Sequence, residues 1–279
     1  MLNDIMMIGT AAKPKRYDDN LSSFCFLIGN TCFIFEMPID TAFAFERHSV
    51  NTIFAKHIFN YVVVSTSTTD ESNCGVGYFA NIFTSSVFNP FKMNIMYVAP
   101  KPHLRTLDEV IGSRIIDNRI VNWPDVLAAE NINVKFYNLT DEIAELTYDV
   151  GTGKDVTLNL NPIPSINPFK RYSADLSYDG QSIHYTGLYG ATSTEELDEM
   201  LDLDNDKEYV IHCDGYKVHS DYVLSKVREL NHQNEIYKKI QFTGFNYEHL
   251  AAELNPMTYA QLLERNERRM YHHIGTQGH

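Results

Sequence analysis

Short apolar runs separated by polar turns dominate the chain, and each run has the length of a β-strand. Apolar or alternating segments of about four to eight residues, bounded by turn signals, are typical of strands. Such segments lie at residues 5–9, 23–29, 31–37, 61–65, 93–100, 172–187, 208–215 and 238–246, and as short strands within 132–160. The chain is therefore predicted to be rich in β-structure along most of its length.

Tight turns and helical patterns lie between these strands. The pairs Gly29-Asn30 and Asp179-Gly180 favour hairpin turns, because these residue types tolerate a positive φ. Apolar positions at helical spacing predict helices at residues 50–59, 107–117, 194–201 and 220–231. Two strand-rich halves, each with its own helices, predict the α/β class, as a four-layer αββα sandwich in which two mixed β-sheets are flanked by helices.

No repeat, low-complexity block or Pro/Gly/Ser-rich linker divides the sequence. We therefore predict a single domain over residues 1–279. Residues 257–279 have an amphipathic pattern. They predict a C-terminal helical extension that docks either on its own domain or on a partner.

Composition narrows the classes of function. The chain has 36 acidic and 23 basic residues and a formal net charge of -13, whereas general binding to a nucleic-acid backbone depends on Lys and Arg. General nucleic-acid binding is therefore not expected. The four cysteines form no C-x-x-C pair, and no run approaches the about 18 apolar residues of a membrane span. These features predict a soluble, cytoplasmic protein that does not bind membranes.

Four segments carry a family resemblance. They read IGTAAKPKRYDDNLSS at 8–23, VVVSTSTTDESNCGVG at 62–77, DLSYDGQSIHYTGL at 175–188 and VIHCDGYKVHS at 210–220. In this order they resemble the ribonuclease Z and phosphodiesterase branch of the metallo-β-lactamase superfamily, over about residues 5–250. The resemblance implies the metallo-β-lactamase fold, and homodimers are frequent in that branch.

The resemblance also implies that the metal ligands of the family are missing. After its strand the family has T-H-x-H-x-D-H, whereas the four ligand positions of this chain hold Thr66, Thr68, Asp70 and Glu71. A hydroxyl is a poor ligand for a first-row metal compared with an imidazole. Leu188 replaces a carboxylate that bridges two metals in the family, and Gly244 replaces the last His ligand. No metal and no cofactor are therefore expected.

Two further segments compare differently with the family. The hairpin at 31–37 runs into IFEMPID, which lacks the family's buried Asp and its Gly turn. In contrast, His212, His219 and Ser220 align with positions that help to stabilise or protonate a phosphate in the family. The candidate ligand-binding residues of the old cleft are thus Thr66, Thr68, Asp70, Glu71, His212, His219 and Ser220.

The concerted loss of ligands on separate loops, with strands and turns kept, favours a catalytically inactive protein that acts by binding. Its role would be that of a scaffold, an assembly factor or a sequestering protein, with a protein partner or a second copy of itself. The Asn- and Tyr-rich composition is typical of viral or low-GC bacterial chains.

Two alternatives stay open. One is a metal-dependent phosphodiesterase or nuclease, in which Mg²⁺, Mn²⁺ or Zn²⁺ holds a water at a site rebuilt from Asp70, Glu71, His212 and His219. The other is a metal-free protein that holds a nucleotide in the old cleft without cleaving it. A helix that begins at His219 and Ser220 offers free N–H groups to a phosphate.

Overall fold

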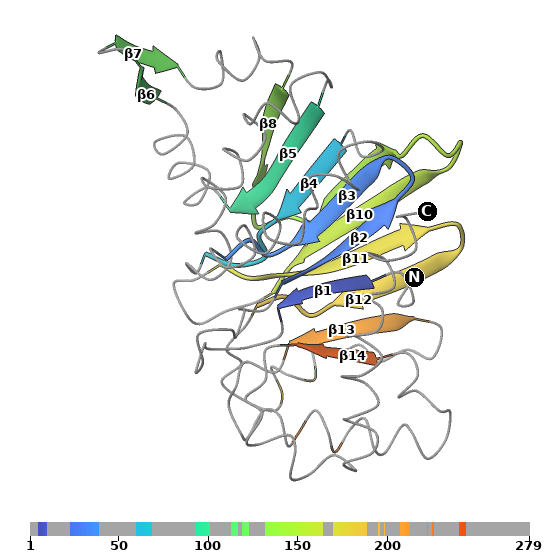
Figure 1. Cartoon of the computed structure of the whole chain (residues 1–279). Coiled ribbons are helices and arrows are strands. Elements are labelled where there is room, and N and C mark those ends of the chain that lie inside the picture. The colour runs from blue at the N-terminus through green and yellow to red at the C-terminus, as the bar shows by residue number, and fades with distance from the viewer. Residues whose placement is uncertain are drawn as a thin grey trace.

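Two β-sheets form the centre of the molecule in a computed structural model (Figure 1). The structure describes residues 5–9, 23–38, 60–68, 93–100, 113–116, 119–122, 132–163, 170–188, 207–212 and 240–243, with the helical residues Glu195, Asp198, Tyr222 and Ser225. Within these residues each large sheet has six strands, and a two-stranded hairpin lies apart from them.

Sheet 1 is built from the first part of the chain. Its strands lie in the order β1 (Ile5–Gly9), β2 (Ser23–Ile28), β3 (Thr31–Phe35), β4 (Asn60–Val64), β5 (Met93–Pro100) and β8 (Ile132–Leu139). The first three strands are antiparallel, and β3, β4, β5 and β8 are parallel. The predicted turn at Gly29-Asn30 joins β2 to β3, and Gly29 has a φ of 57°.

Sheet 2 is built from the second part of the chain and is also mixed. Its strands lie in the order β14 (Ile240–Thr243), β13 (Glu208–His212), β12 (Gln181–Tyr185), β11 (Tyr172–Tyr178), β10 (Asp155–Pro162) and β9 (Ala144–Asp149). Strands β9 to β12 are antiparallel, whereas β12, β13 and β14 are parallel. The turn between β11 and β12 has a positive φ at both Asp179 and Gly180, as a tight hairpin requires.

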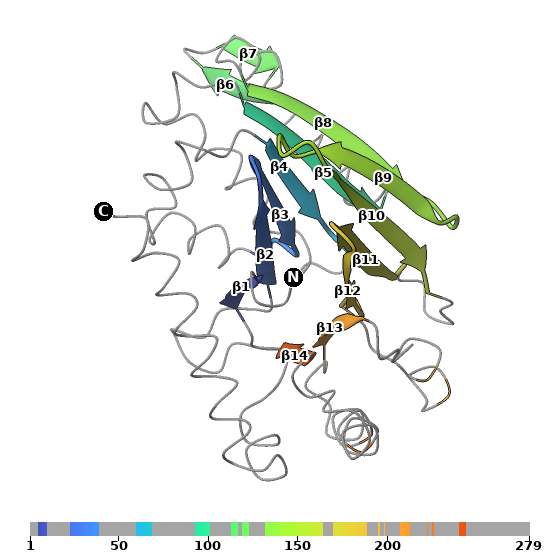
Figure 2. The ribbon, with the colours of Figure 1, turned by 90° about the vertical axis from the view of Figure 1, so that its right-hand side faces the viewer.

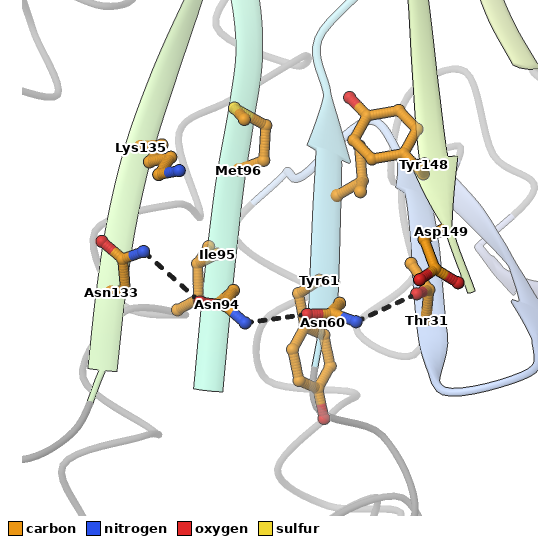
Figure 3. A pocket seen from close by; sticks show the side chains of 11 residues that line it. Thr31, Asn60, Tyr61, Asn94, Ile95, Met96, Asn133, Lys135, Tyr148 and Asp149 are labelled. Carbon is orange, nitrogen blue, oxygen red and sulfur yellow. Dashed lines mark hydrogen bonds between the residues drawn. The ribbon is translucent and has the colours of Figure 1, made fainter. Parts of the chain in front are cut away.

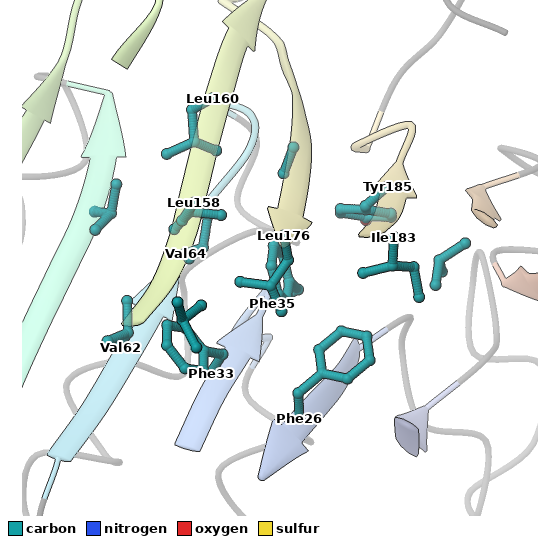
Figure 4. Packing of buried hydrophobic residues seen from close by; sticks show 14 of the residues in the cluster. Phe26, Phe33, Phe35, Val62, Val64, Leu158, Leu160, Leu176, Ile183 and Tyr185 are labelled. Atoms are coloured by element: carbon teal, nitrogen blue, oxygen red, sulfur yellow. The ribbon is translucent and has the colours of Figure 1, made fainter. Parts of the chain in front are cut away.

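One hydrophobic core joins the two sheets (Figure 4). The ring of Phe24 stacks on Phe35 with centroids 4.9 Å apart, and Tyr185 of the opposite sheet meets Phe24 edge-on, also at 4.9 Å. Alternate residues of β10, Val156, Leu158 and Leu160, point into this layer and are fully buried. The period of two along these strands thus places one face of each sheet in the core.

The outer face of sheet 1 is buried as well. Cys25, Cys32, Ile34, Val63 and Tyr97 point away from sheet 2, and each is at most 1% exposed. Burial on both faces explains why these strands read as continuous apolar runs rather than as alternating patterns. Cys25 and Cys32 are free thiols that pack as small apolar residues.

The prediction of a helix at residues 107–117 is wrong for the second half of that range. Residues Ser113–Ile116 form β6, which pairs antiparallel with β7 (Arg119–Asn122). The β-branched side chains at 115, 116, 120 and 121 favour a strand, and cross-strand pairing overrides the helical spacing.

The helices of the predicted outer layers are described only in part. Glu195 and Asp198 are helical within the range predicted at 194–201, and Tyr222 and Ser225 within the range at 220–231. The predicted helix at 50–59 and the extension at 257–279 lie outside the described residues. Among the residues that are described, no helix is long and apolar enough to cross a membrane.

Candidate functional site

Four strand ends from the two sheets meet at one edge of the sandwich. Strands β3 and β4 of sheet 1 end at Phe35 and Val64, and β12 and β13 of sheet 2 end at Tyr185 and His212. In Figure 1 the arrowheads of β3, β4 and β13 point to the same side of the molecule. Side chains that follow these strands are therefore the candidates for a site, as in other sheets with parallel strands.

A buried acid follows β3. Glu36 is 0% exposed and has a φ of 61°, in the left-handed region that residues other than glycine rarely adopt. Its carboxylate accepts hydrogen bonds from the backbone N–H of Thr66, at 3.2 and 3.3 Å, and from the Thr66 hydroxyl. The backbone of Glu36 is held too, because its N–H donates to Val64 and its carbonyl accepts from Ser23. This acid therefore ties the end of β3 to the loop after β4.

The Thr66 hydroxyl also connects the two sheets. Its oxygen accepts a hydrogen bond of 3.0 Å from the backbone N–H of Leu188, which follows β12. Backbone bonds add to this link, from Tyr172 N to Thr66 O at 2.8 Å and from Thr68 N to Lys170 O at 3.1 Å. The Thr66 hydroxyl is thus a donor to one strand end and an acceptor from another.

His212 lies at the end of β13 and is buried, with 4% exposure. Its backbone N–H donates to the Thr186 hydroxyl at 2.9 Å, which connects β13 to the loop after β12. Burial lowers the pKa of the His212 imidazole from 6.5 to about 3. The ring is therefore neutral at physiological pH, and it does not supply a proton there.

The structure brings some of the predicted site residues together. Thr66, Thr68 and His212 lie at this edge, and Leu188 lies beside Thr66 through the hydrogen bond described above. The remaining candidates lie outside the described residues. They are Asp70, Glu71, His219 and Ser220.

Glu36 was missed by the sequence reasoning, which expected this hairpin to end without a buried acid. The positive φ of Glu36 makes the turn here without a Gly. A signal was present, because Glu36 is an acid directly after the apolar strand at residues 31–35 and is followed by Met37 and Pro38. A single acid at the end of a buried strand is rarely left without hydrogen-bond partners.

Among the described residues at these strand ends, Glu36 and His212 carry the side chains that could bind a metal. The carboxylate of Glu36 is hydrogen-bonded to Thr66, and the side chain of Leu188 has no atom that could bind a metal. In the part of the chain that the structure describes, no three His, Cys, Asp or Glu side chains are grouped as metal ligands. Zinc in proteins is held by several such side chains at once.

A second polar cluster lies on the outer face of sheet 2. Asp175 accepts hydrogen bonds of 2.9 Å from Asn161 and from His184 Nδ1, and Lys207 Nζ is 3.9 Å from the same carboxylate. Burial acts to raise the pKa of Asp175, but the hydrogen bond and charge of His184, with Lys207 and Asn161, outweigh it, so the pKa is lowered. The cluster ties β10, β11 and β12 together.

The contact between Thr66 and Glu36 predicts a measurable coupling. We expect Thr66→Val to lower the free energy of unfolding by about 2 kcal/mol, because it leaves the Leu188 N–H without a partner and removes the hydroxyl bond to Glu36, whose carboxylate keeps the backbone N–H of residue 66. In a double-mutant cycle with Glu36→Gln, the interaction energy should be about 1 to 2 kcal/mol by urea denaturation. Thr68→Val is the matched control, because the Thr68 hydroxyl has no hydrogen-bond partner among the described residues. Equal losses at positions 66 and 68 would contradict the assignment.

The lowered pKa of His212 predicts acid sensitivity with a defined sign. Below pH 6.5 the unfolded chain binds a proton at this ring and the folded chain does not, until the pH reaches about 3. The contribution of the neutral His212 ring to the free energy of unfolding is thus fully present above pH 6.5. It is lost as the pH falls, and the free energy of unfolding should decrease by roughly 2 kcal/mol between pH 7 and pH 5. Urea midpoints at both pH values should show this fall in the wild type and a smaller one in His212→Asn. Identical pH profiles would refute it.

Comparisons with known proteins identify the fold. No protein-family model and no curated protein sequence matches the chain. Among solved structures, the short form of human tRNase Z has 12% identity and a TM-score of 0.54, over 86% of this chain and 92% of that one. Zn²⁺-bound PqqB from Methylobacterium extorquens has 12% identity and a TM-score of 0.50, over 94% and 95% of the two chains. At these identities the similarity is one of fold. The predicted metallo-β-lactamase fold, an α/β sandwich of two mixed sheets, is confirmed.

Proposed function

We propose that this chain is a catalytically inactive protein of the metallo-β-lactamase fold, which acts by binding as a scaffold, an assembly factor or a sequestering protein. It binds no metal and needs no cofactor. Its partner is another protein. The free thiols of Cys25 and Cys32 support a reducing compartment, the cytoplasm.

The observation that carries the proposal is the use of Thr66. A residue at a family ligand position donates to Glu36 and accepts from Leu188, so that its donor and one of its two acceptor sites are used within the protein. Leu188 itself is a buried apolar residue at the position of the bridging carboxylate. Ligand positions that connect strand ends stabilise the fold and leave fewer groups for a metal.

The fold does not argue for hydrolysis by itself. tRNase Z and PqqB share the sandwich with this chain at 12% identity. The same fold hosts different functions, and the chemistry depends on the side chains at the site. The neutral, buried ring of His212 is also a poor acid for a leaving group at neutral pH.

Metal content and hydrolysis test the proposal on the purified full chain. After incubation with Zn²⁺ or Mn²⁺ and removal of free ions, we expect mass spectrometry to find well below one metal ion per chain. We also expect no hydrolysis of bis(p-nitrophenyl) phosphate with Zn²⁺, Mn²⁺ or Mg²⁺. About two bound ions per chain, or metal-dependent hydrolysis that Asp70→Asn removes, would overturn the proposal and favour the rebuilt phosphodiesterase site.

A further inference from the structure

The inner face of sheet 1 changes from apolar to polar at the beginning of its parallel strands. Val62 and Val64 of β4 belong to the core between the sheets. Two positions before Val62, the same face of β4 carries Asn60. Asn60 is paired in register with Asn94 of β5, and Asn94 with Asn133 of β8. Asparagine is depleted in strands, so strand formation does not explain three of them in register.

The three asparagines hold one another in place (Figure 3). The side-chain NH₂ of Asn133 donates to the carbonyl oxygen of Asn94 at 3.3 Å, and that of Asn94 donates to Asn60 at 2.9 Å. A carboxamide has two N–H groups, and each of these donors uses one of them in the row. The row is therefore fixed by its own hydrogen bonds, and Asn94 at its centre keeps one N–H for a further acceptor.

A pocket of about 170 Å³ lies against this row of asparagines. Both sheets form its walls, because Tyr148 and Asp149 of β9 line it together with residues of β4, β5 and β8. Figure 2 shows β8 and β9 side by side, each at the end of its sheet. A cavity of about 150 Å³ can hold benzene, so this pocket has room for a ligand of roughly six to eight non-hydrogen atoms.

The pocket carries one cation and one anion that do not pair with each other. Lys135 and Asp149 both line it, and Figure 3 shows them on opposite sides. Neither forms an ion pair with a described residue. One carboxylate oxygen of Asp149 accepts the Gly151 N–H at 2.8 Å, and the other has no hydrogen-bond partner among the described residues. The pocket is thus neutral as a whole but offers one charge of each sign.

Apolar side chains complete the lining. Val62 is 2% exposed and Met96 is half-buried, and both belong to the pocket wall. A ligand with a single charge would leave the opposite charge of the pocket without a partner, and complementary charges are what gives a polar site its specificity. The complementary ligand therefore has a negative group, a positive group and a small apolar part.

We propose that this pocket binds a small zwitterion, an α-amino acid with a short apolar side chain. The ligand carboxylate binds Lys135 and the remaining N–H of Asn94, and the ligand ammonium group donates to Asp149. The pocket lies at the beginning of β4 and β5, whereas Thr66 follows the end of β4. This site is therefore separate from the candidate site at the strand ends, and it does not depend on the proposed function.

Isothermal titration calorimetry with three ligands of similar shape tests this on the full chain. The probe is L-valine, isobutylamine lacks its carboxylate, and isovalerate lacks its ammonium group. We expect L-valine to bind with a Kd below about 1 mM. The other two should bind at least about tenfold more weakly. A folded chain that does not bind L-valine, so that the pocket holds water only, overturns the proposal. Equal binding of either single-charge ligand overturns it as well.

Two variants locate the charges. Lys135→Met removes the cation and keeps most of the stem, and Asp149→Asn removes the anion and keeps an acceptor for Gly151. Each should weaken L-valine binding about tenfold. Because each variant removes the partner of one ligand group, Lys135→Met should bind L-valine and isobutylamine within about twofold of each other. In the same way, Asp149→Asn should no longer distinguish L-valine from isovalerate. A variant that still favours L-valine tenfold contradicts the assigned contact.

Lys170→Met and Asp179→Asn are the matched controls. Lys170 pairs with Asp141 at 2.7 Å and Asp179 pairs with Lys154, and neither Lys170 nor Asp179 lines the pocket. Both control variants should bind L-valine as the wild type does. Losses as large as those of Lys135→Met and Asp149→Asn, in chains that circular dichroism shows to be folded, would place the ligand elsewhere and overturn the proposal.

Discussion

Gly187→Ala is expected to lower the free energy of unfolding by about 4 kcal/mol or more. Gly187 follows β12 with a φ of 77°, and a Cβ there would lie 2.0 Å from the Tyr172 carbonyl oxygen and 3.1 Å from the Thr66 hydroxyl. The backbone of Tyr172 is held by its 2.8 Å hydrogen bond to Thr66, so it does not move away freely. For a chain of this size the melting temperature should fall by about 10 °C, which calorimetry measures.

Gly180→Ala provides the matched control for that result. Gly180 has a φ of 74°, but a Cβ there meets nothing within 4 Å. Its loss should therefore be only about 1 kcal/mol, the conformational preference alone. If both variants lose the same stability, the close approach of Gly187 to Tyr172 and Thr66 adds nothing to the conformational preference for glycine.

Phe35→Ala is expected to cost about 4 kcal/mol. Phe35 is 1% exposed and occupies the layer between the sheets. Its ring stacks on Phe24 at 4.9 Å, meets Phe26 at 6.1 Å and lies 5.7 Å from Tyr185 of sheet 2. Truncation leaves a cavity at the point where the two sheets touch, directly before Glu36. Urea denaturation measures the loss.

Phe136→Ala separates this core effect from the loss of any aromatic contact. Phe136 also stacks on a ring, Tyr97 at 5.7 Å, but it is 38% exposed. Without a buried cavity, its truncation should cost no more than about 1 kcal/mol. A loss at position 136 as large as that at position 35 would mean that the inter-sheet layer is not the main source of stability.

The two large effects have a common consequence for function. Gly187 and Phe35 adjoin Leu188 and Glu36, the residues that the Thr66 hydroxyl connects. Where a metal site would need several free donors, these strand ends are joined by packing and hydrogen bonds. These strand ends therefore contribute to the stability of the sandwich, which a binding protein needs as much as an enzyme does.

Strands were predictable from sequence because they are buried apolar runs. The structure places β5 at Met93–Pro100, which is the predicted range. It places β4 at Asn60–Val64, one residue earlier than the predicted range of 61–65. Burial on both faces makes such runs continuous, and the turn pairs between them mark their ends. The helix prediction failed at residues 113–116 because helical spacing and strand propensity coincide there, and only pairing between β6 and β7 decides between them.

The sequence by itself determined which chemical groups stand at these strand ends: hydroxyls at Thr66 and Thr68 and an apolar side chain at Leu188. Only the tertiary structure decided how these groups are used. Thr66 binds Glu36 across 30 positions of the chain and Leu188 across 122. The side-chain hydrogen bonds from Asn133 to Asn94 and from Asn94 to Asn60 likewise depend on three parallel strands in register. Such neighbours are set by long-range strand pairing, and no local pattern of residues specifies which strand ends will meet.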